Sequence, residues 1–143
     1  MVFSEKMKRC GLSPMRKFAP YAAKAEEKGR KIYHLNIDQP DIETPSVFFD
    51  AVKNFSQPVL AYAPSAGMPV LLDAIREYYG RIGAALTNDN ILISAGGSEA
   101  LQMLLSSILD DGDEIIIPEP FYPNYSTFVT LTGASIRPIT TRP

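Results

Sequence analysis

Apolar side chains recur at helical spacing in several stretches of this 143-residue chain, and turn or capping residues bound each stretch. Four stretches of this kind begin at Ser13-Pro14, Thr44-Pro45, Pro69 and Ser98. The stripe after Pro45 consists of Val47, Phe48, Ala51, Val52 and Phe55. These signals predict four helices, the first running toward Gly29, and the apolar stripes of the other three are expected to pack into a core.

Shorter apolar runs lie between and after these helices and are typical of β-strands. They cover 32–37, 91–94, 114–117 and 134–140, with a further helical piece that ends near Leu131 and a break at Gly133. The run from Glu114 to Ile117 lacks alternation, which predicts a strand buried on both faces, as in parallel sheets. The alternation of helices and strands indicates an α/β fold.

The most informative segment runs from Asn90 to Tyr125, where the apolar run Ile91–Ile93 leads through Gly96 and Gly97 into the helix begun by Ser98. Backbone amides at such a helix start have no partner within the helix and point outward. Together with the helix dipole they favour a dianion, by roughly 0.3 to 2 kcal/mol per charge interaction. The sequence therefore predicts a phosphate-binding turn that needs no lysine.

An aromatic loop follows the next strand. It contains Pro118, Pro120, Phe121, Tyr122, Pro123 and Tyr125. Ligands of open α/β sheets bind beyond the carboxyl ends of the strands, so this loop and the glycine turn should face the same crevice. We expect a phosphate on one side of that crevice and a flat ring on the other.

Four motifs in this chain resemble those of the class I/II aminotransferases, which are fold-type I enzymes dependent on pyridoxal 5'-phosphate (PLP). The motifs are LNIDQPDIETP at 35–45, LAYAPSAGMPVLLDAI at 60–75, GGSEA at 96–100 and PEPFYPNY at 118–125. The resemblance begins near Ser13 and implies the amino-terminal part of such an enzyme. By resemblance, residues 1–45 form an amino-terminal arm and the start of the small domain. Residues 46–143 then form an incomplete PLP-binding large domain, a three-layer α/β/α structure with a mostly parallel sheet.

The resemblance also implies roles for individual residues. Gly96, Gly97 and Ser98 would hold the cofactor phosphate, and Tyr122 would stack on the pyridine ring. Tyr62 would reach across a homodimer interface to the phosphate of the neighbouring subunit.

Asp38 would border the substrate, at a position where family members very often have glycine. A substrate carboxylate about 4 Å from its carboxylate would be repelled by about 4 kcal/mol at an effective dielectric of 20. The side chain therefore turns away, the substrate preference differs, or activity is no longer under selection.

The implied activity is transfer of an amino group between an amino acid and a 2-oxo acid. These enzymes bind PLP covalently on a lysine downstream of the aromatic loop, yet no lysine follows Lys53 in this sequence. We therefore assign no catalytic residue and expect a truncated chain that is inactive alone. A carbon-sulfur lyase of the same fold and a non-catalytic binding remnant remain open as alternatives.

Composition narrows the partners and the location. The formal net charge of −2 argues against a nucleic-acid or anionic-membrane partner. The basic residues Lys6, Lys8, Arg9, Arg16 and Lys17 are expected to be solvated. Cys10 is the single cysteine, no metal-ligand spacing occurs, and no signal-peptide or membrane-length apolar run is present, so we expect a cytoplasmic protein. His34 is expected to lack a partner and to stay outside the site.

Overall fold

A computed structural model describes residues 2–37 and 39–142 of the chain. Its elements in order are α1 (Glu5–Arg9), the 3₁₀ helix η1 (Pro14–Phe18), α2 (Ala19–Glu26), α3 (Ser46–Lys53), α4 (Pro69–Arg81), the 3₁₀ helix η2 (Asn88–Asn90), α5 (Gly97–Ile108), β1 (Glu114–Glu119), α6 (Asn124–Thr132) and β2 (Ser135–Thr140). All four predicted helices are present. The predicted helical piece near Leu131 is also confirmed, as α6.

Two compact units make up the chain. One comprises Met1–Gln39 together with Gly97–Pro143, and we call it the arm-and-sheet unit. The other, the middle unit, comprises Pro40–Gly96. The predicted domain boundary after residue 45 stays a prediction, and each unit is described by itself below.

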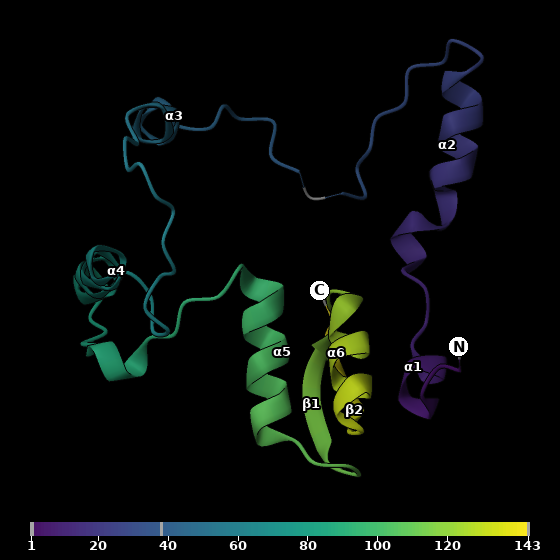
Figure 1. Ribbon diagram of the computed structural model, residues 1–143. Helices are drawn as coiled ribbons and strands as arrows, with labels where there is room; N and C mark the ends of the chain where they lie inside the picture. Colours follow the sequence, from purple (N-terminus) through teal and green to yellow (C-terminus); the bar gives the residue numbers. More distant parts are fainter. Residues whose placement is uncertain (1, 38, 143) are drawn as a thin grey trace. The chain divides into compact units, whose positions relative to one another are not determined.

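The arm-and-sheet unit contains a β-α-β arrangement in which β1 and β2 are parallel (Figure 1). The register pairs Glu114 with Ser135 and Glu119 with Thr140. Gly133, with a φ of +94°, ends α6 in the left-handed conformation and allows the chain to turn into β2. The parallel sheet of an α/β fold is confirmed for these two strands, whereas the predicted three layers are not present in the part of the chain that the structure describes.

Helix α6 is the centre of this unit, because it packs against α1, α5 and β2. Its Val129 is 1% exposed, and Leu105 of α5 is also buried. In β1, burial alternates, and Ile116 is 65% exposed. The prediction that β1 is buried on both faces is wrong here, because no described element covers the face that carries Ile116.

The amino-terminal arm is attached to this centre through Lys6. Its Nζ lies 2.6 Å from Asp111 Oδ1 and donates a hydrogen bond of 3.1 Å to the carbonyl oxygen of Thr132, in the last turn of α6. The hydrogen bond and charge of Lys6 hold the pKa of Asp111 below its usual value. A Cβ at Gly133 would lie 1.6 Å from Asp111 Oδ1, so only glycine leaves room for this contact. Lys6 is therefore not merely solvated, as the sequence suggested.

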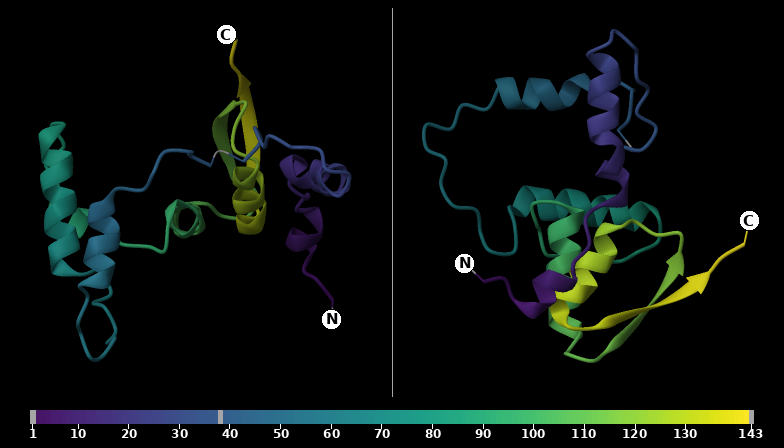
Figure 2. Two further views of the ribbon diagram at one scale, coloured as in Figure 1. Left: turned by 90° about the horizontal axis from the view of Figure 1, so that it is seen from above. Right: turned by 90° about the vertical axis from the view of Figure 1, so that its right-hand side faces the viewer.

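The rest of the arm is helical and then irregular. The helix predicted from Ser13 begins as η1 and continues as α2. The predicted strand at 32–37 is wrong, because the described residues of that segment have no neighbouring strand with which to pair. Figure 2 shows the course of the arm from two further directions.

The middle unit contains α3 and α4 and has a small core. Leu72 of α4 is 5% exposed, and Gly67 is buried so closely beneath Ile93 that a Cβ there would lie 2.3 Å from Ile93 Cγ1. The run 91–94 is not a strand, because no partner strand is described for it.

Burial of the α3 stripe is also not observed. Val47, Phe48, Val52 and Phe55 are each more than half exposed. The apolar spacing of these residues is helical, as predicted, but nothing in the described residues covers them.

Among the described helices, none is both long and apolar enough to cross a bilayer.

Candidate functional site

The glycine turn leads directly into α5, as predicted from the sequence. Gly96 has a φ of +138°, a conformation that side-chain-bearing residues rarely adopt, and the Oγ of Ser94 donates a 3.1 Å hydrogen bond to its carbonyl oxygen. Gly97 and Ser98 are the first two residues of the helix, which is 12 residues long. Their backbone N–H groups belong to the first turn, which helix geometry leaves without intrahelical partners.

Space is open beside both glycines. A Cβ built at Gly96 or Gly97 meets no heavy atom within 4 Å outside the immediate chain neighbours and the helix's own backbone. The missing side chains therefore leave a bare backbone surface at the positive end of a helix dipole. Such a surface suits close approach by a phosphate group.

Tyr122 lies in the loop after β1, where its ring is positioned by local contacts. Its hydroxyl accepts a 2.9 Å hydrogen bond from Asn124 Nδ2, and its ring meets that of Tyr125 edge-to-face at 5.7 Å. Phe121 stacks on Tyr125 at 6.4 Å. The expectation that Phe121 and Tyr125 pack within the loop is confirmed. The Tyr122 side chain is 45% exposed, so one part of the ring is available to a ligand.

The helix start and the aromatic loop lie at the same end of the arm-and-sheet unit. Figures 1 and 2 show α5 running from that end toward the start of β1, and β1 returning to it. This is the end at which the loop with Tyr122 leaves the sheet. Gly97, Ser98 and Tyr122 are therefore placed at one end of this unit, while the expectation that the turn and the loop face the same crevice stays a prediction.

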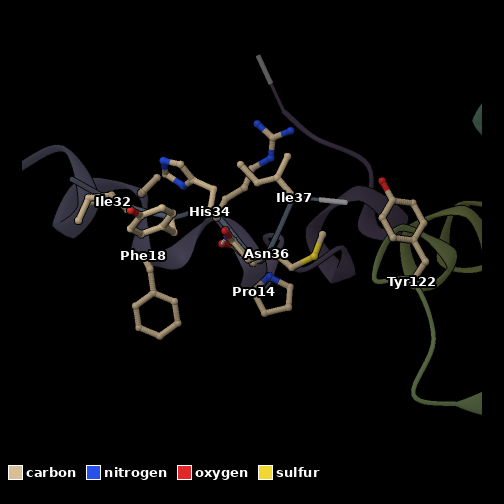
Figure 3. A pocket seen from close by; sticks show the side chains of 12 residues that line it. Pro14, Phe18, Ile32, His34, Asn36, Ile37 and Tyr122 are labelled. Carbon is tan, nitrogen blue, oxygen red and sulfur yellow. Dashed lines mark hydrogen bonds between the residues drawn. The ribbon is translucent and has the colours of Figure 1, made fainter. Parts of the chain in front are cut away.

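A cavity of about 900 Å³ lies within this unit, between the arm and Tyr122. The arm contributes Pro14, Met15, Arg16, Phe18, Ala19, Ala22, Ile32, Tyr33, His34, Asn36 and Ile37. In the view of Figure 3, Tyr122 stands at one end, Phe18 and Ile32 stand at the other, and Ile37 lies between them. Asn36 Nδ2 donates a 2.9 Å hydrogen bond to the carbonyl oxygen of Met15, which joins the two arm segments that line the cavity.

The remaining predicted site residues lie elsewhere. Gly96 is the last residue of the middle unit, and Tyr62 belongs to the loop between α3 and α4 of that unit, with a fully exposed side chain. Asp38 is outside the described residues. The site roles of all six residues therefore stay predictions, and only three of these residues are brought to one end of one unit.

Several residues that line the cavity or contact Tyr122 were not identified from the sequence. Asn124, which binds the Tyr122 hydroxyl, stands two residues away within the same motif and could have been recognised as a possible local partner. Phe18 and Ile32 resemble ordinary core positions, and no sequence signal marks them as cavity lining. His34 does have a partner, contrary to the sequence expectation, because its Nε2 lies 3.6 Å from Glu26 Oε1.

These features fit a flat molecule that carries a phosphate. The turn offers backbone donors and room for a dianion, and Tyr122 offers an aromatic face near the same sheet edge.

Comparison with known proteins supplies the family. The model of "Aminotransferase class I and II" matches residues 30–143. The chain belongs to the class I and II aminotransferase family.

Individual aminotransferases show the extent of the similarity. The chain is 40% identical over 115 residues to the (5-formylfuran-3-yl)methyl phosphate transaminase of Methanocaldococcus jannaschii. It is 32% identical over 124 residues to the aspartate/prephenate aminotransferase of Thermus thermophilus. These matches cover 79% and 85% of the chain but 31% and 32% of the relatives, so the chain spans about a third of their length.

Solved aminotransferase structures give the same result for the fold. A mutant of the Thermus thermophilus aspartate aminotransferase superposes with a TM-score of 0.90 at 30% identity, over 100% of this chain and 38% of that chain. An alanine aminotransferase from Pyrococcus furiosus superposes with a TM-score of 0.86 at 31% identity, over 99% and 37%. The structure is therefore part of a fold-type I aminotransferase, a family that depends on PLP.

Proposed function

We propose that this chain supplies the phosphate turn and the ring-stacking wall of a PLP site, in a protein that transfers amino groups between amino acids and 2-oxo acids. The observation that carries the proposal is the arrangement of Gly97, Ser98 and Tyr122 at one end of the arm-and-sheet unit. Family membership and the open space at the two glycines support it.

Each residue has a distinct role in this proposal. The N–H groups of Gly97 and Ser98 bind phosphate oxygens, and Gly96 gives the turn its left-handed conformation. Tyr122 orients the pyridine ring by stacking, with its hydroxyl held by Asn124. When bound, PLP supplies an electron sink for chemistry at the substrate α-carbon.

Two further roles are proposed for the assembled protein. Tyr62, whose side chain is fully exposed, reaches the phosphate of a neighbouring subunit in a homodimer. Asp38 borders the substrate. In the assembled protein the strands belong to a three-layer α/β/α domain, which covers the sheet face that carries Ile116.

The 143-residue polypeptide itself is proposed to bind PLP without turning over substrate. Its seven lysines are Lys6, Lys8, Lys17, Lys24, Lys28, Lys31 and Lys53, and none follows the aromatic loop. Borohydride treatment in the presence of PLP should therefore leave no stoichiometric adduct on any single lysine, as measured by mass spectrometry. A stoichiometric adduct on one lysine would contradict this proposal.

Substitution of Tyr122 tests the site itself. Tyr122→Ala removes the ring and should weaken PLP binding about tenfold, because aromatic stacking contributes about 0.5–1.5 kcal/mol beyond area burial. Tyr122→Phe keeps the ring and loses only the hydrogen bond with Asn124, so its affinity should stay within about threefold of the parent. The measurement is a titration followed by PLP absorbance. Equal affinities for the parent and Tyr122→Ala would refute the stacking role.

A further inference from the structure

Helix α6 connects the loop that carries Tyr122 to the point at which the arm is attached. The first turn of α6 is hydrogen-bonded to the loop, because the backbone N–H of Tyr125 donates a 3.0 Å bond to the carbonyl oxygen of Tyr122. Asn124, the first residue of the helix, binds the Tyr122 hydroxyl at 2.9 Å. The helix ends at Thr132 and is about 14 Å long at 1.5 Å per residue. A displacement of its last turn is therefore transmitted to the loop.

Lys6 binds this last turn through two kinds of interaction. Its Nζ donates a 3.1 Å hydrogen bond to the carbonyl oxygen of Thr132, one of the terminal carbonyls that have no partner within a helix. Its positive charge also lies at the negative end of the helix dipole. The same Nζ lies 2.6 Å from Asp111 Oδ1, in the turn before β1. A Cβ at Gly133 would lie 2.9 Å from the Nζ, so the ammonium group fits closely at this helix end.

The arm also reaches the first turn of α6. Residues 11–14 follow α1 directly, and they line a small cavity of about 250 Å³ together with Pro123, Asn124, Ser126 and Thr127. Pro14 and Met15 then line the larger cavity beside Tyr122. The arm therefore meets both ends of α6, with α1 at one end and residues 11–15 at the other.

We propose that Lys6 is a positioning residue for the cofactor site, because its attachment of α1 to α6 fixes the orientation of the Tyr122 ring. This inference rests on the proposed function, since it takes that ring as the wall on which PLP stacks. Lys6 acts through α6 and through residues 11–15, and it does not touch the cofactor. Without the attachment the ring is present but less ordered, so PLP has to order it on binding and binds more weakly.

Replacement of the Lys6 ammonium tests the proposal while the residues proposed to touch PLP stay unchanged. Lys6→Met keeps a long side chain and should raise the Kd for PLP about threefold, as expected of a residue coupled to a site through rigid structure. Lys8→Met is the matched control, because Lys8 pairs with Glu5 within α1, and it should change the Kd less than about 1.5-fold. Equal Kd values for Lys6→Met and Lys8→Met would overturn the inference.

A double-mutant cycle separates positioning of the Tyr122 ring from a general loss of stability. In the Tyr122→Ala background there is no ring to position, so adding Lys6→Met should change the Kd for PLP less than about 1.5-fold. The same threefold loss in both backgrounds would show that Lys6 acts on the fold alone and would overturn the inference.

The side-chain amide of Asn124 reports the position of the Tyr122 hydroxyl in the absence of any cofactor. In Lys6→Met, the NMR signals of this amide should move toward those of Tyr122→Phe, which lacks the hydroxyl, and in Lys8→Met they should stay at the parental positions. Unmoved signals in Lys6→Met would overturn the inference. Absence of PLP binding by the parent chain, with the Asn124 shift still observed, would refute the proposed function but support the control of Tyr122 by Lys6.

Discussion

Gly97 is the residue at which folding and cofactor binding can be separated most cleanly. Its φ is not positive, it stands at the first position of α5, and a Cβ there would meet only open space. The fold therefore gives no steric reason for glycine at this position. A phosphate that approaches the backbone closely does give one.

Gly97→Ala should therefore leave the chain as stable as the parent or stabilise it by up to about 1 kcal/mol, because alanine restricts the unfolded chain and favours helix. It should weaken PLP binding about tenfold, since the added methyl group occupies the space of the phosphate. Thermal unfolding and PLP titration measure the two effects.

Gly80→Ala is the matched control, because Gly80 also lies in a helix with open space around it. It should give a similar change in stability with unchanged PLP affinity. A loss of PLP affinity in both variants, or in neither, would contradict the role of Gly97.

At the scale of elements, the attachment of α1 to α6 depends on Lys6, which contacts both Asp111 and the Thr132 carbonyl. The pKa of Asp111 is lowered by this contact, so its ionised form is favoured in the folded chain. The contribution of this pair is fully present above the ordinary aspartate pKa of 3.8 and is lost as the pH falls through the lowered pKa.

Lys6→Met should therefore weaken the attachment of α1 to α6 at neutral pH. In this variant the attachment should also no longer depend on the ionisation of Asp111. Amide hydrogen exchange in α1 measures the effect, with faster exchange expected in Lys6→Met. Lys8→Met is the control, because Lys8 pairs with Glu5 within α1 itself. Equal exchange in the two variants would show that Lys6 does not hold the arm.

Element types were predictable from the sequence where local signals suffice. The Pro69 start and the apolar spacing of α4 need no distant partner to specify a helix, and Gly133 marks the turn between α6 and β2. Strands depend on pairing, so the runs at 32–37 and 91–94 formed none in the absence of a described neighbour. The cavity could not be predicted, because Phe18 and Tyr122 are far apart in sequence and line the same cavity only through tertiary structure.

At the scale of the whole molecule, most large apolar side chains are poorly covered. In the described residues, the buried hydrophobic side chains are Leu72, Leu105 and Val129, whereas Phe48, Phe55 and Ile116 are each more than half exposed. The two-stranded sheet also leaves strand edges available for pairing. Exposed apolar surface and open edges both favour association.

The 143-residue polypeptide should therefore self-associate at micromolar concentration. Size-exclusion chromatography with light scattering should give a mass above that of one 15.7 kDa chain. Ile116→Lys places a charge on the uncovered sheet face and should reduce the associated fraction, whereas Lys53→Arg should not. A clean monomer at all concentrations would contradict this expectation.

The central claim is that the backbone at the start of α5 binds the phosphate of PLP. Amide NMR of Gly97 and Ser98 during titration tests it most directly, with pyridoxal as the ligand that lacks the phosphate. We predict that PLP and inorganic phosphate both move these two amide proton signals downfield, as hydrogen bonding to a dianion requires, and that pyridoxal does not. Unmoved signals with PLP, or equal shifts with pyridoxal, would contradict the claim.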